Sequence, residues 1–159
     1  MIDLRARGAQ VPAGGTRFGD LVHALLAAVP FGADRGAVDD LAAVHGRIVR
    51  ATDEEMAAAS ATVARVLSHS IMQRARDAEA RGACRREAPV TSTVGRGELV
   101  EGVVDLAFEE HGAWTVVDYK TDREIAAAGE ERYKRQVAFY ARAIAEATGQ
   151  SARGVLVRL

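Results

Sequence analysis

Two aspartates and a lysine are the side chains of this 159-residue chain whose spacing best suits catalysis. Asp105 lies in the apolar run GVVDLAF and Asp118 in WTVVDYK, and Lys120 follows two positions after Asp118, on the same strand face. Carboxylates on facing strands repel each other, and burial adds to that cost. A shared proton, a basic clamp or a divalent cation would compensate. We favour hydrolysis assisted by a metal ion over the alternative, a partly exposed ion-pair cluster at a sheet edge.

The turn between the two strands decides whether the aspartates meet. If His111 and Gly112 form a two-residue hairpin turn, residues whose numbers sum to 223 face each other. Asp105 then lies opposite Asp118, with the Cβ atoms about 5 Å apart. A four-residue loop over 109–112 would make them diagonal neighbours on one face, because an even shift preserves the face.

The elements that must position these residues follow from hydrophobic spacing and turn signals. Apolar residues recur at helical spacing in the N-terminal half, whereas the segment after Cys84 is rich in Val and Thr. The order favours an α/β domain with a mixed sheet. We predict helices at 16–29 with Thr16 as N-cap, at 34–50 with Val38, Leu41, Val44 and Ile48 inward, and at 52–80, then a three-stranded antiparallel meander over 84–120 with turns at 95–98 and 109–112, a helix at 131–149 and a buried strand at 152–159.

Composition narrows the possible functions. Apolar residues make up 48% and charged residues 27% of the chain, and the net charge is −1, which is ordinary for a globular domain. The single cysteine, Cys84, rules out an internal disulfide and a cysteine-ligated zinc or iron–sulfur site. There is no membrane-spanning apolar run, no signal-peptide pattern and no GxxxxGK[ST] nucleotide motif. We therefore expect a cytoplasmic protein with no membrane association and no bound nucleotide.

Four motifs in a fixed order carry a family resemblance. They are FGDLVHALL with His23, GVVDL with Asp105, VVDYKT with Asp118 and Lys120, and RQVAFY with Gln136 and Tyr140. Together they resemble the RecB-like branch of the PD-(D/E)XK nuclease superfamily, most of all the C-terminal nuclease domain of AddA- and RecB-type helicase–nuclease subunits. The resemblance runs from about Phe18 to the end. Related AddB-like and Cas4-like nucleases carry four cysteines for an iron–sulfur cluster, which this chain lacks.

The resemblance implies a fold and a reaction. The fold would be a restriction-endonuclease-like α/β domain, a mixed sheet flanked by helices, in which 1–15 is an N-terminal tail, 16–82 a helical part and 83–159 the catalytic core. The reaction would be Mg²⁺- or Mn²⁺-dependent, exonuclease-type hydrolysis of DNA in double-strand-break repair or recombination. The implied roles are metal ligation by His23, Asp105 and Asp118, catalysis by Lys120, support of the site by Gln136 and Tyr140, and an auxiliary role for Glu87.

The implied partners are DNA, as single strands or unwound ends, and a helicase, as a domain or as a separate chain. We expect phosphate contacts from the basic residues that flank the site in sequence, although the last of them also suits a solvated helix face. The competing hypothesis is a catalytically silent module that binds DNA or a helicase. The chain would be either a fragment of a larger helicase or a free-standing nuclease. The basic residues are Arg85, Arg86, Arg123 and Lys134.

Overall fold

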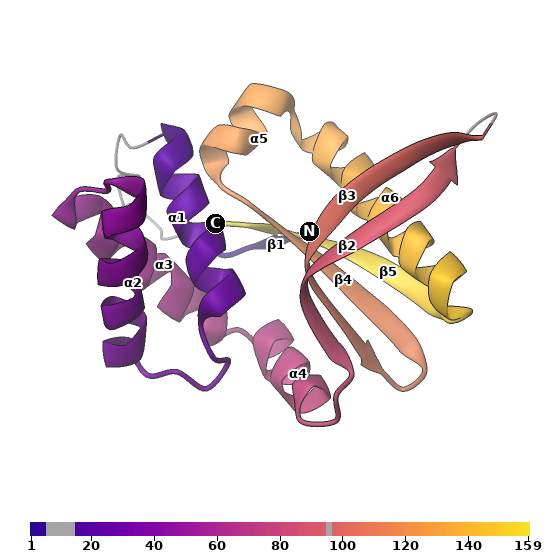
Figure 1. Cartoon of the computed structure of the whole chain (residues 1–159), viewed down its shortest axis with the longest axis horizontal. Helices are drawn as coiled ribbons and strands as arrows, with labels where there is room; N and C mark the ends of the chain where they lie inside the picture. The colour runs from indigo at the N-terminus through magenta and orange to yellow at the C-terminus, as the bar shows by residue number, and fades with distance from the viewer. Residues whose placement is uncertain (6–14, 95–96) are drawn as a thin grey trace.

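A five-stranded mixed sheet forms the centre of the molecule (Figure 1). The computed structural model describes residues 1–5, 15–94 and 97–159. The strand order is β1-β5-β4-β3-β2; β2, β3 and β4 are antiparallel neighbours, and β5 runs parallel to both β4 and β1. The predicted meander and the predicted α/β class are therefore confirmed. The strands are β1 (Ile2–Asp3), β2 (Cys84–Val94), β3 (Glu98–Glu110), β4 (Ala113–Lys120) and β5 (Ser151–Arg158).

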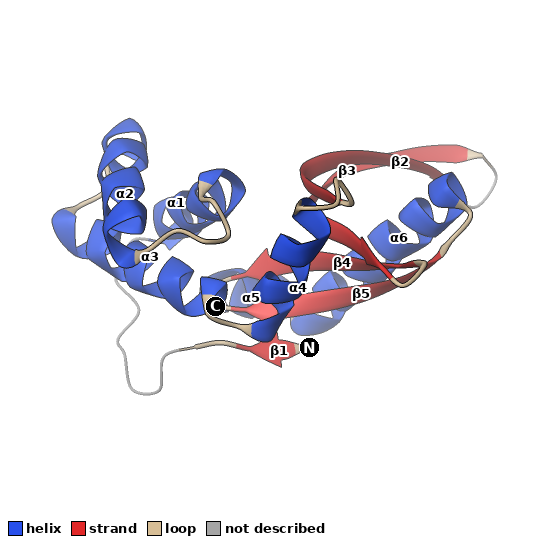
Figure 2. Ribbon diagram, turned by 90° about the horizontal axis from the view of Figure 1, so that it is seen from below, coloured by secondary structure: helices blue, strands red, loops and turns tan. Residues whose placement is uncertain are grey.

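Helices cover both faces of this sheet (Figure 2). One apolar core packs residues of α1–α4 against Phe108, Val117 and Tyr119 of the strands. A second core lies beneath α6 and includes Val116 and Leu156. The helices are α1 (Gly15–Ala28), α2 (Arg35–Val49), α3 (Asp53–Leu67), α4 (Ser70–Glu79), α5 (Asp122–Ala128) and α6 (Glu130–Thr148). No helix in the described ranges is both long and apolar enough to cross a bilayer.

The first two helices lie where the sequence predicts them, but details differ. Helix α1 begins at Gly15, so Thr16 lies in its first turn and is not its N-cap. Helix α2 buries two small residues, Ala42 and Gly46, and Gly46 leaves room for the Met56 side chain of α3. The prediction that Val44 and Ile48 face inward is wrong: their side chains are 56% and 73% exposed.

The predicted helix over 52–80 is two helices, α3 and α4. Thr52 and Glu55 form a reciprocal capping box at the start of α3. At the break, His69 leaves helical geometry, and its Nδ1 accepts a hydrogen bond of 3.2 Å from the backbone N–H of Ile71, which caps α4. The apolar periodicity suggested one continuous helix, but the side chain of His69 accepts a local hydrogen bond and divides it into two.

The hairpin between β3 and β4 has the predicted two-residue turn. His111 and Gly112 both have positive φ, 53° and 76°, as a tight turn of the type that suits twisted strands requires. Pairing runs from Glu110 opposite Ala113 to Leu106 opposite Val117. The register that would place Asp105 opposite Asp118 is therefore set, and the ladder stops one residue before them.

Two short elements were not predicted. Part of the expected tail over 1–15 is strand β1, which pairs with the outer edge of β5, and most of the remaining tail lies outside the described residues. The predicted turn at 95–98 likewise lies partly outside them. Helix α5 fills the connection between β4 and α6, and Gly129, with a φ of 83°, separates the two helices.

Candidate active site

Asp105 ends the β3–β4 ladder with its own side chain. Its Oδ2 accepts a hydrogen bond of 2.7 Å from the backbone N–H of Tyr119, which would otherwise lie opposite Val104. A carboxylate thus takes the place of a strand carbonyl, and β3 separates from β4 at this point. The separation leaves polar groups of both strands beside α1 and α5.

Asp118 and Lys120 form a buried pair on β4. Asp118 is 1% exposed and Lys120 is 7% exposed, and Nζ lies 2.9 Å from Asp118 Oδ2. This is ion-pair distance without hydrogen-bond geometry, so Oδ2 is buried without a hydrogen-bond partner, and Nζ donates instead to the carbonyl of Tyr119. The ion pair agrees with the prediction that the two side chains project from one face of the strand.

The surroundings shift the pKa values of both groups. Burial, together with repulsion from Asp105, raises the pKa of Asp118 to about 6 against the opposing effect of the Lys120 ammonium. Burial opposes the charge on Lys120, but Asp118 and Asp105 outweigh it, so the pKa of Lys120 is raised. The charges of both aspartates therefore stabilise the same ammonium group, as expected for side chains that lie close together on β3 and β4.

His23 reaches this cluster from α1. Its Nδ1 lies 3.4 Å from Asp105 Oδ1, and its ring meets the Tyr119 ring edge-on at 6.3 Å. Burial lowers the pKa of His23, but the hydrogen bond and charge of Asp105 raise it by more, so the net shift is upward. Phe18, Val22 and Leu25 on neighbouring positions are buried and fix the helix that carries His23.

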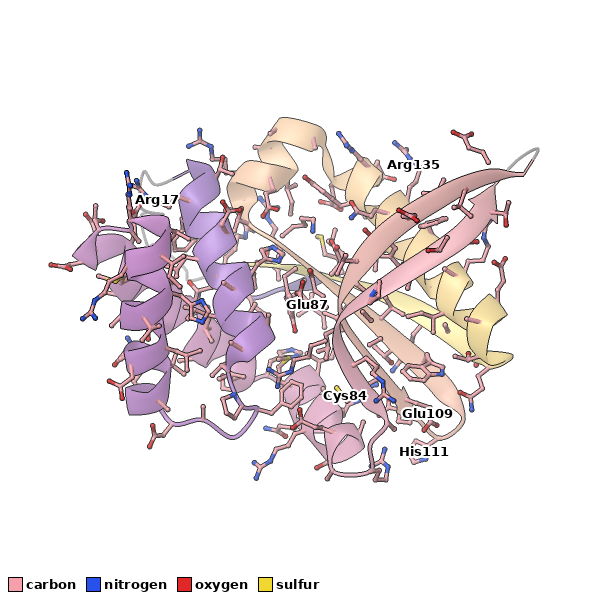
Figure 3. All side chains as sticks on the ribbon, in the orientation of Figure 1. Arg17, Cys84, Glu87, Glu109, His111 and Arg135 are labelled. Carbon is pink, nitrogen blue, oxygen red and sulfur yellow. The ribbon has the colours of Figure 1, made fainter. Side chains whose placement is uncertain are left out.

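Glu87 also lies at the cluster. In the β2–β3 register, Arg86 pairs with Leu106 and Ala88 with Val104, so Glu87 is at the level of Asp105. Its φ of 48° is unusual for a non-glycine residue. Figure 3 shows Glu87 between α1 and the strands. Burial and the charge of Asp105 raise its pKa.

The motif analysis missed one acidic residue, Glu124 of α5. Its Oε2 accepts hydrogen bonds from the backbone N–H of Thr121 at 2.7 Å and from the Thr121 hydroxyl at 2.8 Å. Its Oε1 lies 4.0 Å from His23 Nε2. Glu124 and Tyr133 also line a hollow of about 210 Å³ beside α1. The signal was present in the sequence: TDRE has the spacing of a capping box, which predicts a helix start at Thr121.

The helix-motif residues of α6, Gln136 and Tyr140, form a pair that packs against β3. Gln136 Nε2 donates to the Tyr140 hydroxyl at 2.8 Å. The Tyr140 ring lies against Gly102, where a Cβ would fall 2.5 Å from a ring carbon. About two turns before Tyr140 on α6, the Tyr133 ring lies 5.1 Å from Lys120 Nζ. Tyr133 is thus an α6 residue that contacts the Asp118–Lys120 pair.

The four candidate phosphate-binding residues have different surroundings. Arg86 donates to the carbonyls of Leu26 and Val29 and stacks at 3.7 Å on the Phe31 ring, so its guanidinium caps the end of α1. These contacts give the guanidinium of Arg86 a role in holding α1.

The other three are exposed. Arg85 donates to nearby backbone carbonyls, and Lys134 pairs with Glu130 and Glu131 on its own helix. Arg123 lines the hollow beside α1, with its guanidinium against Gly15. Arg123 is consequently the best placed of the four to meet a substrate near the cluster.

The donor set fits a hard divalent cation in kind. Asp105 and Asp118 supply carboxylate oxygens, and His23 Nε2 and Asp118 Oδ2 are buried polar atoms without hydrogen-bond partners. Within 1–5, 15–94 and 97–159, however, no three acidic, histidine or cysteine side chains converge into a preformed metal site. The Lys120 ammonium, 2.9 Å from Asp118 Oδ2, occupies the position of a cation there.

Comparison with known proteins gives the family of the chain. The family model described as "PD-(D/E)XK nuclease superfamily" matches residues 3–159. The chain belongs to the PD-(D/E)XK nuclease superfamily. The match covers both the helical part and the sheet, so α1 with His23 is part of the superfamily domain.

Two curated relatives of this PD-(D/E)XK chain share one name, that of the A-type subunit of an ATP-dependent helicase/nuclease. The relative from Acetivibrio thermocellus is 45% identical over 58 residues, which is 35% of this chain and 5% of that protein. The relative from Lachnoclostridium phytofermentans is 42% identical over 50 residues, which is 29% of this chain and 4% of that protein. The matched segments are thus small parts of much longer proteins.

Proposed function

We propose that this PD-(D/E)XK protein is a divalent-metal-dependent deoxyribonuclease that degrades DNA ends together with a helicase, in the cytoplasm, during double-strand-break repair. The observation that supports it most is the meeting of His23, Asp105, Asp118 and Lys120 where β3 leaves β4. Family membership supports the hydrolysis of phosphodiesters, and the name of the two relatives supports a role alongside a helicase.

Each residue has a role in this proposal. Asp105, Asp118 and His23 would hold a Mg²⁺ or Mn²⁺ ion, which would polarise the phosphate and lower the pKa of water. Lys120 would orient the attacking water or steady the negative charge that develops on the phosphate. Glu87 would add a further carboxylate beside Asp105, and Tyr140 with Gln136 would hold β3 in place. Arg123 would meet a phosphate at the rim.

A thermal-shift titration tests metal binding without activity. With Mg²⁺ at about 100 times its Kd, the wild type should gain about 2.7 kcal/mol, or roughly 5–11 °C in Tm for a chain of this size. Asp105→Asn should lose the response while keeping an oxygen that accepts from the N–H of Tyr119. A wild type whose Tm ignores both Mg²⁺ and Mn²⁺ would overturn the proposed metal site.

End-labelled linear DNA, single- and double-stranded, tests the reaction. With Mn²⁺, wild-type protein should shorten single strands faster than duplexes, and Lys120→Met should slow cleavage by roughly a hundredfold or more. Lys134→Met is the matched control, because Lys134 is exposed and paired on its own helix. Salt-dependent DNA binding with no cleavage in either metal would instead identify a silent binding module.

A further inference from the structure

The hollow of about 210 Å³ beside α1 adjoins the candidate active site. Helix α5 lies between α1 and α6 (Figure 1), and residues of all three helices line the hollow. Thr121, which directly follows Lys120 in the chain, also lines it. The ring of Tyr133 borders both places, because it lines the hollow and its centre lies 5.1 Å from the Lys120 ammonium. A group held in the hollow would therefore lie next to the phosphodiester that we propose is cut.

Small residues keep this space open. On α1, Gly15 and Gly19 are one helical turn apart and both line the hollow, as does Ala127 of α5. A Cβ at Gly15 would fall 2.7 Å from a guanidinium nitrogen of Arg123, so glycine at this position leaves room for that side chain. The volume is below the roughly 300–1,000 Å³ of pockets for drug-sized ligands, so the hollow suits a single ring system and not a base pair.

The lining favours an uncharged ring with polar edges over a phosphate. Tyr133 is half-buried and supplies an aromatic surface, and Asp20 and Glu124 supply carboxylates. Among the described residues that line the hollow, these two carboxylates outnumber the one cation, Arg123, so a phosphate inside would meet net negative charge. A nucleobase carries no charge, and adenine, cytosine and guanine each have an amino group that can donate a hydrogen bond to a carboxylate.

We propose that the hollow receives one unpaired nucleobase of the DNA strand that is cut, held against the ring of Tyr133, while the exposed Arg123 meets the backbone of the same strand. This inference rests on the proposed function, because it takes DNA as the substrate. A base in a duplex would first have to be unpaired and unstacked, at a free-energy cost that a single strand avoids. Tyr133 is thus a specificity-determining residue that favours single strands over duplexes.

Binding of abasic DNA tests the hollow without cleavage. Fluorescent single strands of about eight nucleotides, with all their bases or with none, are titrated with the protein in EDTA and followed by anisotropy. The wild type should prefer the strand with bases, and Tyr133→Leu should reduce this preference roughly fivefold to a hundredfold. Tyr133→Phe keeps the ring, is the matched control and should keep the preference. Because the preference is a ratio of two Kd values within one protein, a smaller folded fraction in a variant cancels.

Cleavage in Mn²⁺ provides a second readout. On an end-labelled single strand with one abasic residue, the wild type should pause at a linkage a fixed distance from that residue, and Tyr133→Leu should lack the pause.

The two readouts separate this inference from the proposed function. Cleavage without a pause, together with an equal preference in wild type and Tyr133→Leu, would overturn the role of the hollow and leave the nuclease standing. Binding that depends on Tyr133, in a wild type that cuts no DNA in Mg²⁺ or Mn²⁺, would overturn the proposed function and leave the hollow as a binding site for an unpaired base. A wild type that neither binds nor cuts single strands would overturn both.

Discussion

The buried Asp118 should make the metal-free protein less stable as the pH rises. Its pKa of about 6 in the fold lies above its ordinary 3.8, so folding favours the protonated carboxyl. The resulting stabilisation is fully present below pH 3.8 and is lost as the pH rises through 6. Each pH unit between these values is worth about 1.36 kcal/mol. Between pH 8 and pH 5 the wild type should therefore gain about 1.4 kcal/mol from this group.

Asp118→Asn removes that titration and keeps the shape. We expect the difference in Tm between wild type and Asp118→Asn, measured in EDTA by scanning calorimetry, to change by roughly 3–6 °C between pH 5 and pH 8 in a chain of this size. His23 titrates in both proteins, so its contribution largely cancels. Asp40→Asn, which removes an exposed carboxylate of α2, should follow the wild type at every pH. A Tm difference that stays constant across this range would refute the reasoning.

Three further changes probe the framework around the site. Gly154→Ala should cost about 1–3 kcal/mol in urea unfolding, because its Cβ would lie 2.9 Å from the carbonyl oxygen of Val137; an unchanged midpoint would mean that α6 can move away from β5. Thr52→Ala should cost about 1 kcal/mol, since its hydroxyl caps α3, and a neutral result would show that the cap is dispensable. One glycine inserted between His111 and Gly112 should abolish the Mg²⁺-induced rise in Tm, because an odd shift turns side chains to the other face; a retained rise would contradict the register argument.

Much of the sheet could be predicted because its signals are local. Alternating apolar residues and the His111–Gly112 turn define β3 and β4 and set their register, and the order of elements then gives the α/β class. What the sequence could not show is that the ladder ends at Asp105. That feature depends on a carboxylate replacing a backbone carbonyl, a tertiary competition that spacing does not reveal.

The misplaced helix features have the same kind of cause. The apolar spacing continues across Ser68 and His69 and so predicted one helix, because the spacing of apolar residues does not reveal that His69 caps a new helix. Apolar spacing also assigned Val44 and Ile48 to the interior, whereas α2 buries Val38 together with Ala42 and Gly46, which are too small to give a strong hydrophobic signal. The capping role of Glu124 could be predicted from its spacing, but its proximity to His23 depends on how α5 packs beside α1, which the sequence does not show.

The hydrogen bond from the backbone N–H of Tyr119 gives Asp105 a structural role beside its proposed role as a metal ligand. A related protein that had lost activity would tolerate replacement of Lys120 more readily than replacement of Asp105, because the separation of β3 from β4 depends on the Asp105 carboxylate. Alanine at this position would confound loss of chemistry with local rearrangement, whereas asparagine separates the two. An aspartate or asparagine at this position in a related protein would therefore be weak evidence that the protein is an active enzyme.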